Sequence, residues 1–172
     1  AVPVSVNVSA WQFQRPEFIA EIEHALGDAG VAPGLLKLEL TESTVMDDAQ
    51  AAVQKMTRLK QLGVRISLDD FGTGYSSLGY LRKLPIDEVK IDQSFVRDIV
   101  SDSYAATLCR AIIAMSQQLH FTVVAEGVET PAQAQLLRDS GCQLLQGFLY
   151  SKAVAASDFG ALLARGMRWS AD

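Results

Sequence analysis

The chain has 172 residues, the size of one domain, and its 49% hydrophobic and 20% charged residues exclude a disordered chain. Its 15 Lys and Arg residues against 20 Asp and Glu residues give a net charge of −5, which argues against a nucleic-acid polymer as partner. Two cysteines without CxxC spacing exclude a disulfide framework, and we interpret Cys109 and Cys142 as buried thiols in a reducing compartment. Because no apolar run reaches the roughly 20 residues that span a bilayer, we expect no membrane contact by this segment.

Strand-like and helix-like segments alternate along the whole chain. The strands are predicted at residues 2–8, 35–40, 64–68, 86–91, 121–125 and 144–149, and the helices at 18–26, 48–62, 78–83, 105–119, 131–141 and 156–164. Gly27 and Gly30 are expected to stop the first of these helices, and Ser9 is a candidate helix cap. Trp11 and Phe13 are expected to pack against the first helix, and His24 and His120 are interpreted as surface residues.

This alternation is typical of βαβ units in a parallel sheet. A closed barrel of eight such units takes about 250 residues. The chain is therefore expected to be either an open six-stranded sheet or an α/β fold of the (β/α)8 TIM-like barrel type, here with six of the eight βα units. The strand-like run at the very start of the sequence favours the second interpretation and a fragment of a longer chain.

Polar residues recur where each predicted strand ends. They are Asn7, Glu39, Glu42, Asp69, Asp70, Lys90, Asp92, Glu126, Glu129 and Gln146. In a parallel barrel these ends converge on the face that carries the active site. Converging carboxylates repel one another, and hard divalent ions such as Mg²⁺ or Mn²⁺ relieve that repulsion with oxygen ligands. The pattern predicts metal-assisted hydrolysis or transfer at phosphorus.

Each of these residues also has a plain structural interpretation. Asn7 and the pair Asp69-Asp70 are turn-forming residues, Glu42 suits a helix start, and Lys90 could mark an edge strand. Glu126 precedes a glycine, as in an ordinary strand-to-helix turn. Their joint recurrence at successive strand ends favours a common site.

The motif series resembles that of the EAL-domain family, the cyclic di-GMP phosphodiesterases of bacterial signalling proteins. The motifs are Asn7-Val8-Ser9, Glu39-Leu40-Thr41-Glu42, Asp69-Asp70-Phe71-Gly72-Thr73-Gly74-Tyr75-Ser76-Ser77-Leu78, Lys90-Ile91-Asp92-Gln93-Ser94-Phe95, Ala125-Glu126-Gly127-Val128-Glu129-Thr130 and Gln146-Gly147-Phe148. The resemblance covers essentially the whole chain in order. It implies a modified (β/α)8 barrel that hydrolyses cyclic di-GMP to linear pGpG with two Mg²⁺ or Mn²⁺ ions.

The resemblance also implies roles for individual residues. Asn7, Glu39 and Asp69 would hold the first ion, and Asp69 would bridge to the second, with Asp70 beside it. Glu126 would serve the second ion or its water, and Lys90 would contact the attacking water. Either Lys90 or Glu126 is expected to be the general base. The supporting or substrate-binding residues would be Glu42, Asp92, Glu129 and Gln146.

Beyond the catalytic site, the resemblance implies a homodimer formed through the loop and helix after Asp70, with Glu42 anchoring that loop. It also implies a cytoplasmic location, which leaves room for membrane tethering of a longer parent protein.

Two departures from the family pattern stand out. The Glu-Ala-Leu motif is absent, so residues 1–172 are expected to be a single EAL-type domain that is incomplete at its N-terminus. The usual Ser-Lys-Pro is Ser151-Lys152-Ala153. The alternatives are a non-catalytic cyclic di-GMP receptor and a regulatory dimerisation module.

Overall fold

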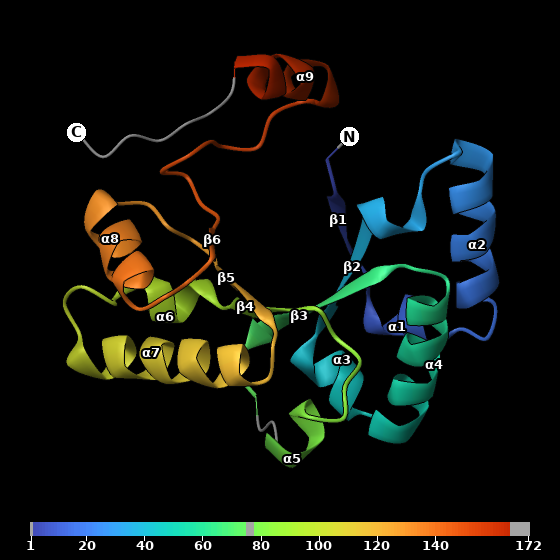
Figure 1. Cartoon of the computed structure of the whole chain (residues 1–172), viewed down its shortest axis with the longest axis horizontal. Helices are drawn as coiled ribbons and strands as arrows, with labels where there is room; N and C mark the ends of the chain where they lie inside the picture. Colours follow the sequence, from blue (N-terminus) through green and yellow to red (C-terminus); the bar gives the residue numbers. More distant parts are fainter. Residues whose placement is uncertain (1, 75–77, 166–172) are drawn as a thin grey trace.

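Six parallel strands form one sheet in the computed structural model, which describes residues 2–74 and 78–165. Neighbouring strands in the sheet are also neighbours in the sequence, so the order is β1 to β6. The strands are β1 (Val4–Asn7), β2 (Leu36–Thr41), β3 (Arg65–Phe71), β4 (Glu88–Ile91), β5 (Thr122–Ala125) and β6 (Leu144–Leu145). Figure 1 shows them along an arc, and the sheet is thus a half-barrel of parallel strands.

Helices follow the strands and cover the outer side of this arc (Figure 1). They are α1 (Ala10–Gln14), α2 (Phe18–Ala29), α3 (Glu42–Met46), α4 (Ala49–Gln61), α5 (Leu78–Leu81), α6 (Gln93–Arg97), α7 (Ser103–Gln118), α8 (Pro131–Asp139) and α9 (Ala156–Arg165), with a 3₁₀ turn at Pro33–Leu35. In the figure α9 lies apart from the other helices, across the open side of the arc. Within the described ranges, no helix is long and apolar enough to cross a membrane.

Side-chain caps explain where several helices begin. Ser9 and Gln12 form a capping box at α1, which confirms the predicted cap, and Thr130 and Gln133 form another at α8. The side chain of Asp48 accepts a hydrogen bond from a backbone N–H in the first turn of α4. These contacts satisfy N–H groups that have no partner inside the helix.

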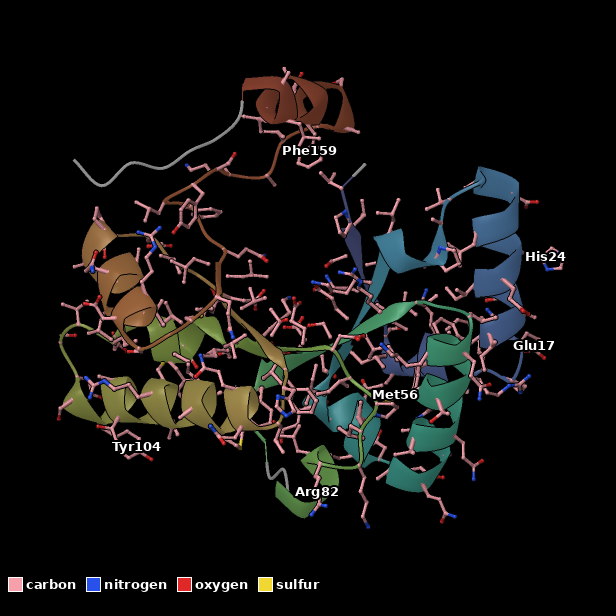
Figure 2. All side chains as sticks on the ribbon, viewed as in Figure 1. Glu17, His24, Met56, Arg82, Tyr104 and Phe159 are labelled. Atoms are coloured by element: carbon pink, nitrogen blue, oxygen red, sulfur yellow. The ribbon has the colours of Figure 1, made fainter. Side chains whose placement is uncertain are left out.

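The two faces of the sheet differ in chemistry. The side chains toward the helices are apolar and 0–1% exposed, among them Leu38, Leu40, Ile66, Leu68, Val89 and Ile91. Met56 of α4, also fully buried, lies between that helix and the sheet (Figure 2). Because side chains alternate along a strand, the intervening residues face the inside of the arc, and they include Lys37, Glu39, Asp69, Glu88 and Lys90. Charged residues thus occupy a position that branched apolar residues usually fill in such barrels.

Several local predictions need correction. Gly27 does not stop the first long helix, which runs on to Ala29 and ends at Gly30 in a left-handed conformation. The last predicted strand shrinks to β6 because the chain turns at Gly147, where an added Cβ would lie 2.1 Å from the Val128 carbonyl oxygen. The short helices α1, α3 and α6 were not predicted as helices.

The predicted burial of individual side chains is confirmed at most positions. Phe13 is buried as expected, whereas Trp11 is 69% exposed and does not pack into the core. His24 points outward from α2 (Figure 2), and His120 is exposed as well. Cys109 and Cys142 are buried, and burial raises the pKa of both thiols to about 11.

Candidate active site at the carboxyl ends of the strands

Lys90 on β4 occupies the centre of a group of carboxylates. Its Nζ atom lies 2.6 Å from Glu39 Oε2, 2.7 Å from Glu126 Oε1 and 3.1 Å from Asp69 Oδ2. The three acids come from β2, the end of β5 and β3. The Lys90 side chain is only 5% exposed, so the group is an ion-pair network largely shielded from water. The structure thus joins four of the predicted site residues.

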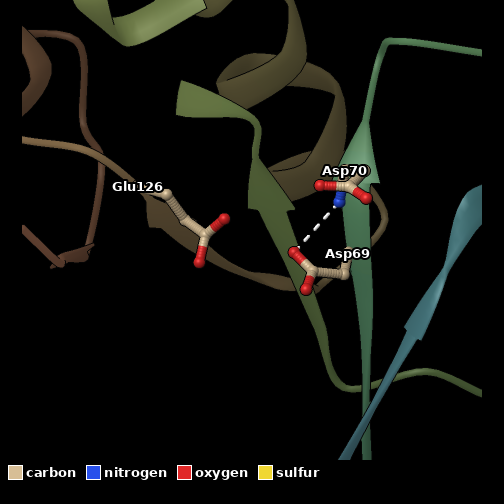
Figure 3. Close-up of side chains that lie close together, drawn as sticks. All are labelled: Asp69, Asp70 and Glu126. Carbon is tan, nitrogen blue, oxygen red and sulfur yellow. Dashed lines mark hydrogen bonds between the residues drawn. The ribbon is translucent and has the colours of Figure 1, made fainter. Parts of the chain in front are cut away.

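Asp69, Asp70 and Glu126 form a second arrangement within this region (Figure 3). Each offers one carboxylate oxygen, and these oxygens lie within 4.8 Å of one another. Asp70 has φ = 55°, an uncommon conformation for a residue other than glycine, and its N–H donates a 3.0 Å hydrogen bond to Asp69 Oδ1. Such strain, about 1–3 kcal/mol, persists only where neighbouring structure enforces it. Here the loop folds back, and the Thr73 hydroxyl donates to the Asp70 carbonyl at 2.8 Å.

The charges in this region change the proton affinities of the side chains. Burial by itself would lower the pKa of Lys90, but its hydrogen bonds to Glu126 and Glu39 outweigh burial and raise it. Burial is the main cause that raises the pKa of Glu126, with smaller contributions from the charges of Asp69 and Glu39. Burial, followed by the charges of Asp69 and Asp92, raises the pKa of Asp70. Lys90 therefore keeps its proton at neutral pH, and the two acids hold theirs more tightly than ordinary carboxyls.

The donor set fits a hard divalent cation. Asp69, Asp70 and Glu126 supply carboxylate oxygens, the ligands that Mg²⁺ and Mn²⁺ prefer. Burial is the main cause of the raised pKa values of Asp70 and Glu126, and the neighbouring acids add to it, so a cation bound among these oxygens would favour their ionised forms. Glu39 contacts the same Lys90 ammonium as Asp69 and Glu126, and Asn7 pairs with Glu39 in the strand register.

Glu42, the first residue of α3, holds the loop after β3. Its side chain is 3% exposed, and its Oε2 accepts a 3.1 Å hydrogen bond from the N–H of Gly72. The other oxygen, Oε1, has no hydrogen-bond partner among the described residues. Because a Cβ on Gly74 would lie 2.6 Å from Oε1, the loop passes directly over Glu42. Residues 75–77 of this loop, part of the predicted dimer contact, lie outside the described residues.

Other predicted site residues lie at the strand ends with different contacts. The Asp92 side chain caps α6 by accepting a 2.9 Å hydrogen bond from the Ser94 N–H. Glu129 is exposed and lies two residues before α8 begins. Asn7 and Gln146 are exposed as well, and Gln146 lines a cavity together with Glu39 and Lys90.

Sequence reasoning missed a second buried ion pair on the same face of the sheet. Lys37 on β2 and Glu88 on β4 lie 2.6 Å apart, and Ser67 on β3 donates a 3.0 Å hydrogen bond to Glu88. Their signal was present in the sequence, because Lys37 and Glu39, like Glu88 and Lys90, are charged residues two apart in a predicted strand. Residues two apart share a face.

Comparison of the sequence and the fold with known proteins shows the family to which this site belongs. Residues 1–153 match the family described as EAL domain. The chain belongs to the EAL domain family. It is 48% identical over 149 residues to cyclic di-GMP phosphodiesterase NbdA of Pseudomonas aeruginosa, across 87% of this chain and 19% of NbdA. The family predicted from the motifs is thereby confirmed.

Solved structures of EAL proteins share the fold. The PaMucR phosphodiesterase in complex with c-di-GMP, from Pseudomonas aeruginosa, gives a TM-score of 0.89 at 44% identity, covering 91% of this chain and 64% of that chain. A manganese and cyclic di-GMP complex of Klebsiella pneumoniae BlrP1 gives 0.81 at 30% identity, covering 87% of this chain and 38% of that chain. These likenesses confirm the predicted α/β half-barrel of six parallel units. The chain spans about a fifth of the length of the curated relatives it matches.

Proposed function

We propose that this chain forms part of an enzyme that hydrolyses cyclic di-GMP to linear pGpG. The observation that carries the proposal is the carboxylate cluster of Asp69, Asp70 and Glu126 beside Lys90, in a chain of the EAL family. The relatives NbdA and PaMucR are named as phosphodiesterases, and the PaMucR structure contains c-di-GMP. Residues 1–172 would be a single EAL-type domain, incomplete at its N-terminus, and they cover 64% of the PaMucR chain.

Two Mg²⁺ or Mn²⁺ ions would be held by the oxygen ligands of the site. Asn7, Glu39 and Asp69 would hold the first ion, and Asp69, Asp70 and Glu126 the second. The manganese in the BlrP1 complex supports this choice of metal. Bound ions would lower the pKa of the attacking water and offset charge on the phosphate.

The chain's own residues would orient the water and accept its proton. Hydrolysis joins a water oxygen to phosphorus and breaks the bond from phosphorus to the 3′ oxygen, which leaves as a hydroxyl group. The raised pKa of Lys90 keeps its ammonium protonated, which suits a hydrogen-bond donor to that water better than a proton acceptor. Of the two candidates, Glu126 is the one whose carboxylate can accept a proton, and it lies 2.7 Å from the Lys90 Nζ atom.

The remaining roles follow from position. Glu42 would fix the loop after Asp70, and through that loop and α5 the domain would form a homodimer. Asp92, Glu129 and Gln146 would support the site or contact the nucleotide. As a signalling domain of this family, it would act in the cytoplasm.

The test is hydrolysis of cyclic di-GMP by this chain and by a version extended upstream by about 80 residues, enough for two βα units. Both are assayed with Mg²⁺ and with Mn²⁺, and pGpG is separated by chromatography. We expect pGpG from the extended protein and none from its Asp69→Ala or Lys90→Ala variants.

Two results would contradict the proposal. An extended protein that folds and binds cyclic di-GMP without cleaving it would be a receptor. One that neither binds nor cleaves the nucleotide, yet forms the dimer, would be a regulatory module. Normal turnover by Asp69→Ala or Lys90→Ala would remove the role assigned to that residue alone.

A further inference from the structure

Two ion pairs of opposite polarity are stacked along the inner face of the sheet. We call Lys90–Glu39 the upper pair and Lys37–Glu88 the lower pair; each has an Nζ–carboxylate distance of 2.6 Å. Along β2 the positive Lys37 precedes the negative Glu39, whereas along β4 the negative Glu88 precedes the positive Lys90. Both pairs reach across β3, which separates β2 from β4 in the sheet. All four residues line one cavity of about 410 Å³.

The lower pair is largely shielded from water, and both carboxylate oxygens of Glu88 are hydrogen-bonded. The side chains of Lys37 and Glu88 are 15% and 4% exposed. Glu88 Oε2 contacts Lys37, and Glu88 Oε1 accepts the hydrogen bond from Ser67. Each carboxylate oxygen therefore has a partner that does not belong to the proposed active site.

Glu88 and Lys90 lie two residues apart on one strand and face the same cavity. Their Cα atoms are consequently about 6.6 Å apart, a separation that the flexible lysine stem can cover. A buried carboxylate that lost Lys37 would either take up a proton or pair with another cation, because an isolated buried charge is strongly unfavourable. Lys90 is a cation on the same face, already committed to Glu39, Asp69 and Glu126.

We propose that Lys37 is a positioning residue: by pairing with Glu88, it leaves the Lys90 ammonium to the upper carboxylates. This inference rests on the proposed function, in which Lys90 orients the attacking water. Without Lys37, Glu88 would draw Lys90 down the strand and away from Glu39 and Glu126. Ser67 assists by occupying the second oxygen of Glu88.

The test uses Lys37→Met in the full-length protein that carries this sequence. We expect kcat to fall by about 10- to 100-fold, because a displacement near 1 Å costs that much, with little change in KM. The double variant Lys37→Met/Glu88→Gln removes both charges, and its kcat should return to within about threefold of the wild type. Lys37→Arg, which keeps the charge, should also stay within about threefold. A merely structural pair would change the melting temperature in Lys37→Met and recover it in the double variant, but would leave kcat per folded molecule unchanged in both.

A second measurement does not depend on turnover. A crystal structure of Lys37→Met should show Lys90 Nζ within hydrogen-bond distance of Glu88, and the double variant should show it back at Glu39 and Glu126. If Lys37→Met does not fold, Ser67→Ala takes its place in both measurements, with a smaller displacement expected. The matched control is Lys60→Met, which removes the ammonium that pairs with Asp87, next to Glu88 but outside the cavity lining. Its kcat should not change.

The inference is overturned if Lys90 keeps its contacts in Lys37→Met, or if the double variant is as slow as the single one. If either outcome is found and Lys90→Ala still abolishes hydrolysis, the proposed function is unaffected. If Lys90→Ala hydrolyses cyclic di-GMP normally, the proposed role of Lys90 fails, and the crystal structures alone then decide whether Lys37 positions it.

Discussion

Replacing Lys90 with methionine removes the single ammonium that three acidic side chains share. Met keeps much of the apolar stem, so the change is mainly one of charge. Glu39, Asp69 and Glu126 would be left with side chains 8%, 12% and 18% exposed. Charges so poorly exposed to water depend on a partner for compensation.

Removal of one member of a buried ion pair costs about 3–5 kcal/mol, because the other charge stays buried and unpaired. The loss of stability is not three times larger for the three acids around Lys90, because buried carboxyls take up protons instead of remaining charged. For a domain of this size, each kcal/mol corresponds to about 2–4 °C in melting temperature. We therefore expect Lys90→Met to melt about 6–20 °C below the wild type when metal is absent.

The assay is thermal unfolding followed by circular dichroism in EDTA and again in Mn²⁺. Mn²⁺ at about 100 times its Kd stabilises the wild type by about 2.7 kcal/mol. It should stabilise Lys90→Met by more, because no ammonium competes for the Glu126 and Asp69 oxygens. Lys60→Met is the control, since its ion pair with Asp87 is a third exposed and is worth at most about 1 kcal/mol. Equal melting of Lys90→Met and the control in EDTA, or no extra gain in Mn²⁺, would refute the charge-balance argument.

Two further predictions concern the backbone and the proton balance of the site. Gly127→Ala should destabilise the protein by about 2–4 kcal/mol in urea unfolding, because φ is +66° and the new Cβ would lie 2.6 Å from the Gln93 Cβ. Gly27→Ala, inside a helix with nothing within 4 Å, should instead stabilise it by about 0.5–1 kcal/mol; equal effects would contradict the packing argument. The affinity for Mn²⁺, measured by calorimetry, should fall as the pH is lowered, because Asp70 and Glu126 must release their protons to bind the ion. Since both carboxyls have raised pKa values, the fall should start above the usual carboxyl pKa of about 4. An affinity that stays constant as the pH falls through the usual carboxyl pKa of about 4 would contradict ligation of the metal by these two acids.

Most of the secondary structure was predictable from local signals. The Asp48 and Pro131 positions marked helix starts, and the structure begins α4 at Ala49 and α8 at Pro131. Strand ends were less predictable, because they depend on pairing with distant segments. β3 continues through Asp69 and Asp70 since Thr41 of β2 pairs beside Asp69, whereas β6 ends early at the close contact of Gly147 with Val128.

The sequence by itself determined the alternation of strands and helices, the family, and the acidic residues that gather at the strand ends. These follow from residue spacing along the chain, which is a local property. Only the tertiary structure decided which charge meets which. Lys37 pairs with Glu88, and Lys90 with Glu39, each across 51 residues of sequence. Partner choice depends on the order of strands in the sheet and on which residues face its inner side, and long-range packing sets both.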